Sequence, residues 1–229
     1  MAAVGAGSFR VEQLNLRDSQ KCEAYFRFRS EYFGHYLGWE VLGEDGVDRD
    51  DIDAQSAHFC LIVGDGTVAG SIRVTPPMAR RWMLDMRPFS DLIEHGLDPN
   101  YPRAQSAEVS RLGALPGVAG LTDDRGYTAA QALRRAAYQH SIRSGSRYWY
   151  VIAYRALIER LRRVDYLPFK IISPTVRFDP RGRTCVACLD LAEAYVRMAL
   201  GDPAFLEWNN AGVPMPDLAV LMGSGMENR

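Results

Sequence analysis

The sequence predicts a mixed α/β fold, in which helices cover a mixed β-sheet to give a three-layer α/β/α sandwich. Two apolar runs at 58–63 and 68–74 are joined by Gly-Asp-Gly-Thr at 64–67, which is typical of a β-hairpin. Two further apolar runs, 106–114 and 147–153, are typical of central strands. Segments with apolar residues every three or four positions precede the hairpin and separate these two strands, and such spacing indicates amphipathic helices.

The remaining elements follow in order along the chain. The first helix is expected over 18–36, where Asp18 or Ser19 can cap its start, and Gly38 can end it in a left-handed conformation. The acidic segment 40–53 is expected to be a loop. We further expect a short helix within 82–96, a loop at 117–126, helices at 127–143, 155–163 and 192–200, strands near 169–173 and 185–191, and an irregular tail.

Composition indicates one soluble globular domain over residues 1–229, with residues 1–8 expected to be disordered. Hydrophobic residues make up 47% and charged residues 24%, which are ordinary values for such a protein. We find no run of about 18 apolar residues and no secretory leader, so we expect no membrane span and a cytoplasmic location. A net charge of −1 gives no global field for nucleic acid.

The four cysteines are too few and too scattered for a disulfide framework, so we expect reduced thiols. Cys185 and Cys188 have metal-ligand spacing but no second pair to complete a four-ligand site. We therefore expect no metal and no permanently bound cofactor.

Glu108 and Arg111 lie three residues apart in the central strand 106–114. Unpaired charge inside a sheet is costly, so these side chains need partners or a task. One explanation is a structural ion pair between them. The other is a carboxylate in an open cleft that takes a proton from an amine, beside a guanidinium that holds the acid end of the same substrate.

Five short motifs occur in a fixed order between residues 22 and 114. They are Arg29 with Phe33 and Leu37-Gly38-Trp39, then Asp50-x-x-Asp53, Gly70-x-x-Arg73, Phe89 and Glu108-x-x-Arg111. Together they resemble the acyl-homoserine-lactone synthase family, the autoinducer makers of bacterial quorum sensing. The order of elements also matches the GNAT-like acyl-CoA N-acyltransferase fold.

Two segments depart from that family. Ser56-Ala57-His58 and Cys188-Leu189-Asp190-Leu191 are more similar to the sister family of N-acyl amino acid synthases. Those enzymes share the fold and the donor but acylate a free amino acid without forming a lactone. The acceptor therefore stays open between S-adenosylmethionine and an amino acid.

The resemblance implies a fatty acyl chain carried as a thioester on acyl carrier protein, or less often on coenzyme A, and S-adenosylmethionine as the amine. Residues 18–114 would form the acceptor and catalytic half, and 115–229 the acyl-chain and carrier-protein half. Glu108 is the expected base, acting directly or through water, and Arg29 and Arg111 are expected to grip the acceptor carboxylate. The expected acceptor-binding residues are Arg29, Phe33, Trp39, Asp50, Asp53 and Arg73. Among them, Arg73 is expected to anchor the acidic loop by pairing with Asp50 or Asp53. The residues expected near the acyl donor are Phe89, Ser110, Leu112, Trp149 and Val151.

An arginine-rich stretch in the second half suits docking of the acidic carrier protein, steered by charge. The alternative is an ordinary solvated helix surface. Segment 112–117 lacks the spacing of a pyrophosphate-binding glycine loop and contains Pro116, which favours a carrier protein over free coenzyme A. The docking residues would be Arg134, Arg135, Arg143, Arg147, Arg162 and Arg163.

Three functions remain in view at this point. The leading one is synthesis of an N-acyl-homoserine lactone. The second is N-acylation of a free amino acid. The third, from a different class, is a non-catalytic protein that binds acyl compounds.

Overall fold

The computed structural model describes residues 8–39, 43, 45–64, 66–93 and 96–223. The chain forms two compact units, each assembled from two separate segments. The first unit comprises Met1–Thr75 and Ser110–Ala137, and the second comprises Pro76–Val109 and Tyr138–Arg229. Strand β4 (Ser106–Ala114) and helix α3 (Ala129–Arg143) each contribute residues to both units.

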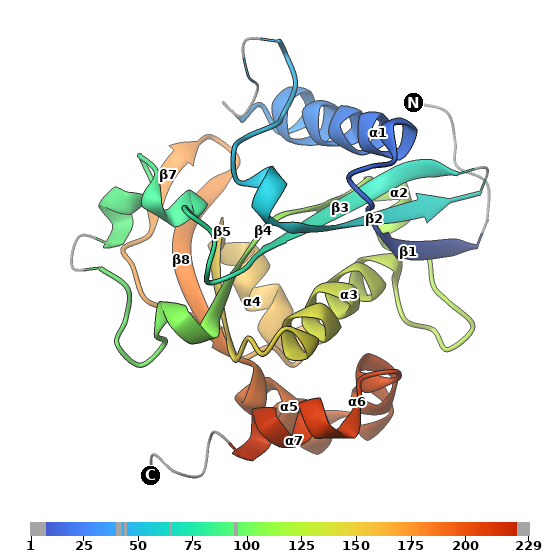
Figure 1. The fold of residues 1–229 in the computed structure, drawn as a ribbon, viewed down its shortest axis with the longest axis vertical. Helices are drawn as coiled ribbons and strands as arrows, with labels where there is room; N and C mark the ends of the chain where they lie inside the picture. The colour runs from blue at the N-terminus through green and yellow to red at the C-terminus, as the bar shows by residue number, and fades with distance from the viewer. Residues whose placement is uncertain (1–7, 40–42, 44, 65, 94–95, 224–229) are drawn as a thin grey trace. The chain divides into compact units, whose positions relative to one another are not determined.

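The sheet of the first unit is built on the predicted hairpin, which is confirmed. Strands β2 (Ala57–Val63) and β3 (Thr67–Thr75) pair antiparallel, with Ala57 opposite Val74, and a bulge interrupts the register between Leu61 and Ile62. A strand that the sequence analysis missed, β1 (Phe9–Gln13), pairs antiparallel with β2 on its other edge (Figure 1). Residues 1–7 of the segment predicted to be disordered lie outside the described part of the chain, and its last residue, Ser8, directly precedes β1.

The first helix covers this sheet and has the predicted extent, but it changes type along its length. Helix α1 (Ser19–Arg29) starts where the Asp18 carboxylate accepts the Lys21 N–H at 3.1 Å, so the predicted cap is confirmed. It packs against β3 and continues as a π-helical segment over Ser30–Tyr36. A wider helical turn of this kind occurs frequently at functional sites.

The second unit contains the parallel part of the sheet. The first half of β4 pairs parallel with β5 (Tyr148–Tyr154), from Ser106 opposite Tyr148 to Val109 opposite Val151. Strand β8 (Gly182–Asp190) pairs antiparallel with β5, and β6 (Lys170–Ile171) and β7 (Val176–Asp179) pair antiparallel with β8. Parallel and antiparallel pairs together confirm the predicted mixed sheet.

Helices α4 (Arg155–Val164) and α5 (Leu191–Gly201) pack on β8 in this unit, and both were predicted (Figure 1). The irregular tail is wrong, because α6 (Pro203–Asn210) and α7 (Met215–Gly223) follow α5. The Asp202 carboxylate caps α6 by accepting the Phe205 N–H, and Pro203 occupies the first turn. The remaining helical segments are α2 (Pro116–Ala119) and the 3₁₀ turns Asp53–Gln55, Met83–Asp85, Ser90–Ile93 and Arg103–Gln105.

Within the part of the chain that the structure describes, no helix is both long enough and apolar enough to cross a bilayer.

Candidate active site

A buried network of arginine and aspartate side chains lies in the first unit. Asp48 is its centre, because its carboxylate accepts hydrogen bonds from two guanidinium groups. Arg29, the last residue of α1, donates Nε and Nη2 to it at 3.1 and 2.9 Å. Arg111, on β4, donates Nε and Nη2 at 2.8 and 2.9 Å. The Asp48 and Arg29 side chains are fully buried, so these are two-pronged ion pairs in a dry environment.

The network continues to the hairpin through Asp53. Arg29 Nη1 donates to Asp53 Oδ1 at 2.6 Å, and Arg73 Nη1 donates to the same oxygen at 2.7 Å. Arg73 also donates to Asp50 Oδ1 at 2.6 Å and to Ser110 Oγ at 2.9 Å. The predicted anchoring of the acidic loop by Arg73 is therefore confirmed, and it engages both aspartates at once.

Local backbone geometry holds Asp48 in place. The Asp48 N–H donates to Ser30 Oγ at 2.9 Å, and Ser30 Oγ donates to the Phe26 carbonyl at 2.8 Å. Arg111 has a φ of 52°, which is rare for a residue other than glycine and interrupts the strand alternation at this position. The helix end and the strained strand residue therefore bring their arginines to one carboxylate.

The Asp48 and Asp53 carboxylates are ionised at neutral pH. Burial raises the pKa of Asp53, but the charges of Arg29 and Arg73 outweigh that effect and hold it at about 2. Burial likewise opposes ionisation of Asp48, and Arg111 and Arg29 outweigh it and lower the pKa below the usual range. The three arginines and three aspartates balance in charge, which makes burial of the group tolerable.

Three of the five N–H groups of Arg29 donate to Asp48 and Asp53, and the side chain is fully buried. The expected grip of Arg29 on an acceptor carboxylate stays a prediction. Two of the Arg111 nitrogens are also used by Asp48. The direct effect of Arg29 is to order the network.

Aromatic side chains lie beside these charges, and the expected role of Phe33 and Trp39 in acceptor binding stays a prediction. Phe33 stacks on Trp39 with ring centroids 5.3 Å apart, and the Arg111 guanidinium carbon lies 5.8 Å from the centre of the Phe33 ring. Gly113 leaves room for this layer, because a Cβ there would sit 2.4 Å from the Tyr32 ring. Only glycine therefore fits at this point of β4.

His58 is part of the same core. Its Nε2 lies 2.8 Å from the Asp53 carbonyl oxygen, so Nε2 donates, and Nδ1 accepts from the Tyr25 hydroxyl at 3.1 Å. Burial lowers the pKa of the imidazole. The nearby Asp53 carbonyl and carboxylate raise it, but their effect is smaller. His58 is therefore a neutral brace for the Asp53 turn.

Glu108 lies in the second unit and has a different environment. Its Oε2 accepts the Met83 N–H at 2.8 Å and its Oε1 accepts the Leu84 N–H at 2.9 Å. The side chain is 0% exposed, so the expectation that it faces an open cleft is wrong for this conformation. The neighbouring Trp82 is buried as well, and its indole N–H donates to the Pro76 carbonyl at 3.0 Å. The turn 83–85 thus covers the Glu108 carboxylate, which binds the backbone N–H groups of that turn.

The residues expected near the acyl donor are distributed over both units. Ser110 belongs to the charge network of the first unit, and Leu112 is half-buried there. In the second unit Phe89 makes an edge contact with Phe178, with centroids 5.7 Å apart. Trp149 is a buried core residue whose indole N–H donates to Ser141 Oγ at 2.8 Å, and Val151 is also buried. Their proposed role in donor binding stays a prediction.

The six arginines proposed for carrier docking are divided in the same way. Arg134 and Arg135 belong to the first unit and the other four to the second. Arg147 pairs with Asp190 at 2.9 Å, Arg162 donates to the Phe169 carbonyl at 2.6 Å, and Arg143 donates to the Gly212 carbonyl at 2.7 Å. Three of the six arginines therefore also stabilise the fold through bonds to groups of the same chain.

Asp48 is the functional residue that sequence reasoning missed. It stands in a run of acidic residues in which any member could have faced inward. The available signal was the buried Ser30 one turn after Phe26, which binds the loop at this residue. Among the described residues, no group of three or more His, Cys, Asp or Glu side chains is placed to hold a metal ion.

Comparison with known proteins gives a family match. Residues 13–163 match the model of the family described as autoinducer synthase. A search of curated protein sequences found no match.

Solved structures share the fold at low identity. TofI, in a ternary complex with an inhibitor and MTA, is 23% identical over 86% of this chain and 99% of that chain, with a TM-score of 0.64. BjaI, a CoA-dependent acyl-homoserine lactone synthase with SAM and isopentyl-CoA, is 17% identical over 90% and 99%, with a TM-score of 0.64. FeeM, an N-acyl amino acid synthase from uncultured soil microbes, is 14% identical over 85% and 97%, with a TM-score of 0.55.

A more distant likeness bears on the fold class. A protein from Lactobacillus plantarum assigned as an N-acetyltransferase is 11% identical over 80% of this chain and 99% of that chain, with a TM-score of 0.51. The predicted GNAT-like fold is confirmed.

Replacing Asp48 should be strongly destabilising. In Asp48→Asn, the two buried guanidinium groups lose their shared counter-charge, and breaking such a buried pair typically costs about 3–5 kcal/mol of unfolding free energy. Urea unfolding, monitored by circular dichroism, measures this loss of unfolding free energy. Glu23→Gln, which removes an exposed pair with Arg27, is the control and should have no measurable effect. A loss below about 1 kcal/mol in Asp48→Asn would contradict the described geometry.

Stability should fall in acid, and Asp53 should contribute to that slope. Its native pKa is about 2, whereas an unfolded aspartate titrates near ~3.9, so the unfolded chain binds more protons as the pH falls between these values. The stabilisation is complete above pH ~4 and is lost toward pH ~2. Denaturant unfolding across this range should therefore show a shallower pH dependence for Asp53→Asn than for the wild type, while Asp91→Asn, at an exposed site, keeps the wild-type slope. Equal slopes for Asp53→Asn and wild type would refute the assignment.

Proposed function

The chain belongs to the autoinducer synthase family, and from that premise we propose that it transfers a fatty acyl group from an acyl carrier protein thioester to the amine of S-adenosylmethionine and closes the product to an N-acyl-homoserine lactone. The family assignment makes it an acyltransferase that serves quorum-sensing signal synthesis. The acceptor, the donor and the ring closure are the parts that we add.

One observation carries the proposal. The motif residues Arg29, Asp53, Arg73 and Arg111 are spread over more than a third of the sequence, yet they meet through hydrogen bonds in one buried network. Phe33 and Trp39 stack beside it. The motif residues are far apart in the sequence and were grouped only by the family pattern, but in the folded chain they contact one another.

The first chemical step is aminolysis of the thioester. The amine nitrogen attacks the thioester carbonyl, a C–N bond forms, the C–S bond breaks, and the thiol leaves on the carrier. An ammonium has no lone pair, so the nitrogen must first lose a proton to a base. Holding the amine against the carbonyl supplies the rest of the acceleration.

Glu108 is our proposed base for that proton. Its two carboxylate oxygens are engaged by the Met83 and Leu84 N–H groups, so access requires the turn 83–85 to release at least one oxygen when substrates bind. Glu108 would then take the amine proton directly or through water.

The second step is displacement at the carbon next to the sulfonium. The carboxylate oxygen of the acylated product attacks that carbon, the C–S bond breaks, and methylthioadenosine leaves. The protein needs to do little more than fold the substrate, because an intramolecular attack has a high effective molarity.

A carrier-protein donor is favoured by the segment after β4. The Leu115 N–H donates to the Ala69 carbonyl at 2.9 Å, and Pro116 supplies no N–H, so this segment offers few donors to a pyrophosphate. BjaI is CoA-dependent and has the same fold, so the fold itself is compatible with either donor. Arg143 and Arg163 are exposed members of the proposed docking set.

A free amino acid is the alternative acceptor. FeeM, an N-acyl amino acid synthase, shares the fold. The Ser-Ala-His segment, which favoured an amino acid acceptor, packs inside the protein. Ser56 Oγ hydrogen-bonds with Thr75 Oγ1 at 2.9 Å, and His58 bonds with the Tyr25 hydroxyl and the Asp53 carbonyl. These contacts are internal, so S-adenosylmethionine remains our first choice.

Product analysis tests the proposal. Purified protein incubated with acyl carrier protein thioester and S-adenosylmethionine should release free thiol, methylthioadenosine and an acyl-homoserine lactone, which mass spectrometry identifies. Parallel reactions receive the acyl-CoA donor or a mixture of amino acids. If the products are N-acyl amino acids and no methylthioadenosine is released, the protein acylates a free amino acid and the lactone proposal is wrong. If no combination of donor and acceptor gives amine-dependent thiol release, both functions are wrong.

Glu108→Gln tests the base. Loss of a positioned base should lower turnover by ~10²–10⁴. Because the amide also disturbs the turn 83–85, the comparison is Asp85→Ala, which removes the acceptor that lies 2.7 Å from the Trp82 N and loosens the same turn while Glu108 keeps its carboxylate. Turnover is normalised to the folded fraction from thermal melts. Equal losses in the two variants would show that Glu108 acts only as a brace.

A further inference from the structure

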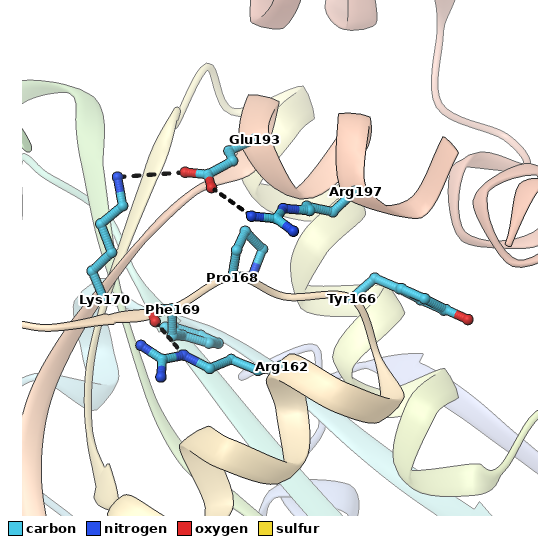
Figure 2. Close-up of a pocket in the computed structure, with 7 residues that line it drawn as sticks. All are labelled: Arg162, Tyr166, Pro168, Phe169, Lys170, Glu193 and Arg197. Carbon is cyan, nitrogen blue, oxygen red and sulfur yellow. Dashed lines mark hydrogen bonds and ion pairs between the residues drawn. The ribbon is translucent and has the colours of Figure 1, made fainter. Parts of the chain in front are cut away.

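A cavity of about 360 Å³ lies in the second unit between the end of α4, the segment 166–170 and α5. Figure 2 shows its lining side chains, with Glu193 and Arg197 on α5, Lys170 on β6 and Arg162 on α4. Arg162 is one member of the proposed docking set, and no other residue assigned above to acyl transfer lines the cavity. The site is therefore separate from the proposed chemistry.

Positive charge predominates around this cavity. Three cationic side chains, Arg162, Lys170 and Arg197, line it together with a single carboxylate, Glu193. Figure 2 shows that carboxylate between two of the cations, with Lys170 Nζ at 3.5 Å from one oxygen and Arg197 Nη2 at 3.9 Å from the other. These separations are long for charge-assisted hydrogen bonds, so Glu193 alone satisfies neither cation, although Lys170 also hydrogen-bonds with the Tyr101 side chain.

The cations also keep unused hydrogen-bond donors. Arg162 donates Nε to the Phe169 carbonyl at 2.6 Å and contacts Glu159 through Nη1, which leaves Nη2 without an acceptor among the described residues. Arg197 pairs with Glu193 and with no other carboxylate of the described chain, and its side chain is 63% exposed. A group with several acceptor oxygens and two negative charges would balance the net charge of the cavity and use these donors.

The rest of the wall is apolar and rigid. Phe169 is buried, and Pro168 and Tyr166 complete the lining. Tyr166 has a φ of 54°, an uncommon conformation for a tyrosine. Its ring lies directly on Gly201, where a Cβ would come within 2.3 Å of it. Figure 2 shows the Tyr166 side chain directed away from the charged lining residues, and its ring packs against Gly201 and Phe205.

We propose that this cavity is a binding site for a small phosphate monoester with an apolar body. The dianionic phosphate group binds at Lys170 and Arg197, and the apolar body lies against Phe169 and Pro168. The volume exceeds what a lone phosphate group needs, which is why the ligand carries an organic part. This binding is additional to acyl transfer and does not depend on it.

Phenyl phosphate, inorganic phosphate and benzoate are the probes, titrated into the full chain by calorimetry at constant ionic strength. We expect phenyl phosphate to bind more tightly than inorganic phosphate, and both more tightly than the monoanion benzoate. The double variant Lys170→Gln with Arg197→Gln should weaken phenyl phosphate binding at least about tenfold. Glu193→Gln, which removes the competing carboxylate, should strengthen it severalfold.

Arg177→Gln is the matched control, because it removes an exposed arginine of the same unit outside the cavity and should leave binding unchanged. Circular dichroism melts confirm that each variant is folded. The proposal is overturned if the double variant binds phenyl phosphate as well as the wild type, if Arg177→Gln loses as much affinity as the double variant, or if benzoate binds as tightly as phenyl phosphate. Binding, not turnover, is measured, so failure here leaves the acyl-transfer proposal unaffected.

Discussion

Sharing of the Asp48 carboxylate between two guanidinium groups is the interaction on which the first unit depends. Arg29 reaches it from the end of α1 and Arg111 from β4, so one acidic side chain joins a helix, a loop and a strand. Arg29 and Arg73 then share Asp53, which ties the loop to the hairpin. Because all these groups are buried and charged, removing one leaves its partner uncompensated, and the arrangement tolerates little variation.

This closed arrangement changes how the motif residues are understood. Charged side chains at intervals in a family pattern invite the interpretation that each contacts substrate. Here the arginines bond to the aspartates, and Phe33 and Trp39 stack beside them. Under the proposed function the arginines would therefore act on the acceptor through the position of these rings and of the acidic loop, and Glu108, which holds the turn 83–85 with both oxygens, would have to be released to act as the base.

Local patterns explain which parts the sequence could predict. The hairpin, α1, α3 and the central strands have clear periodicity or turn residues, and the Arg73 pairing followed from the family spacing. Asp48 could not be separated from Asp50 and Asp53, because the loop path that turns it inward is fixed by Ser30, a residue of the preceding helix. The burial of Glu108 depends on the 83–85 turn, which has no periodic signal. Helix α6 had a readable start in Asp202-Pro203, but its apolar face is too short to register as a pattern.

A double-mutant cycle between Asp48 and Arg111, read from unfolding free energies, tests the central claim most directly. Residues in one buried ion-pair network should show a coupling energy of up to about 3 kcal/mol, so that Asp48→Ala with Arg111→Ala costs clearly less than the sum of the single changes. Additive losses, with a coupling within about 0.3 kcal/mol of zero, would mean that the two side chains do not share the carboxylate, and the account of the first unit would fail.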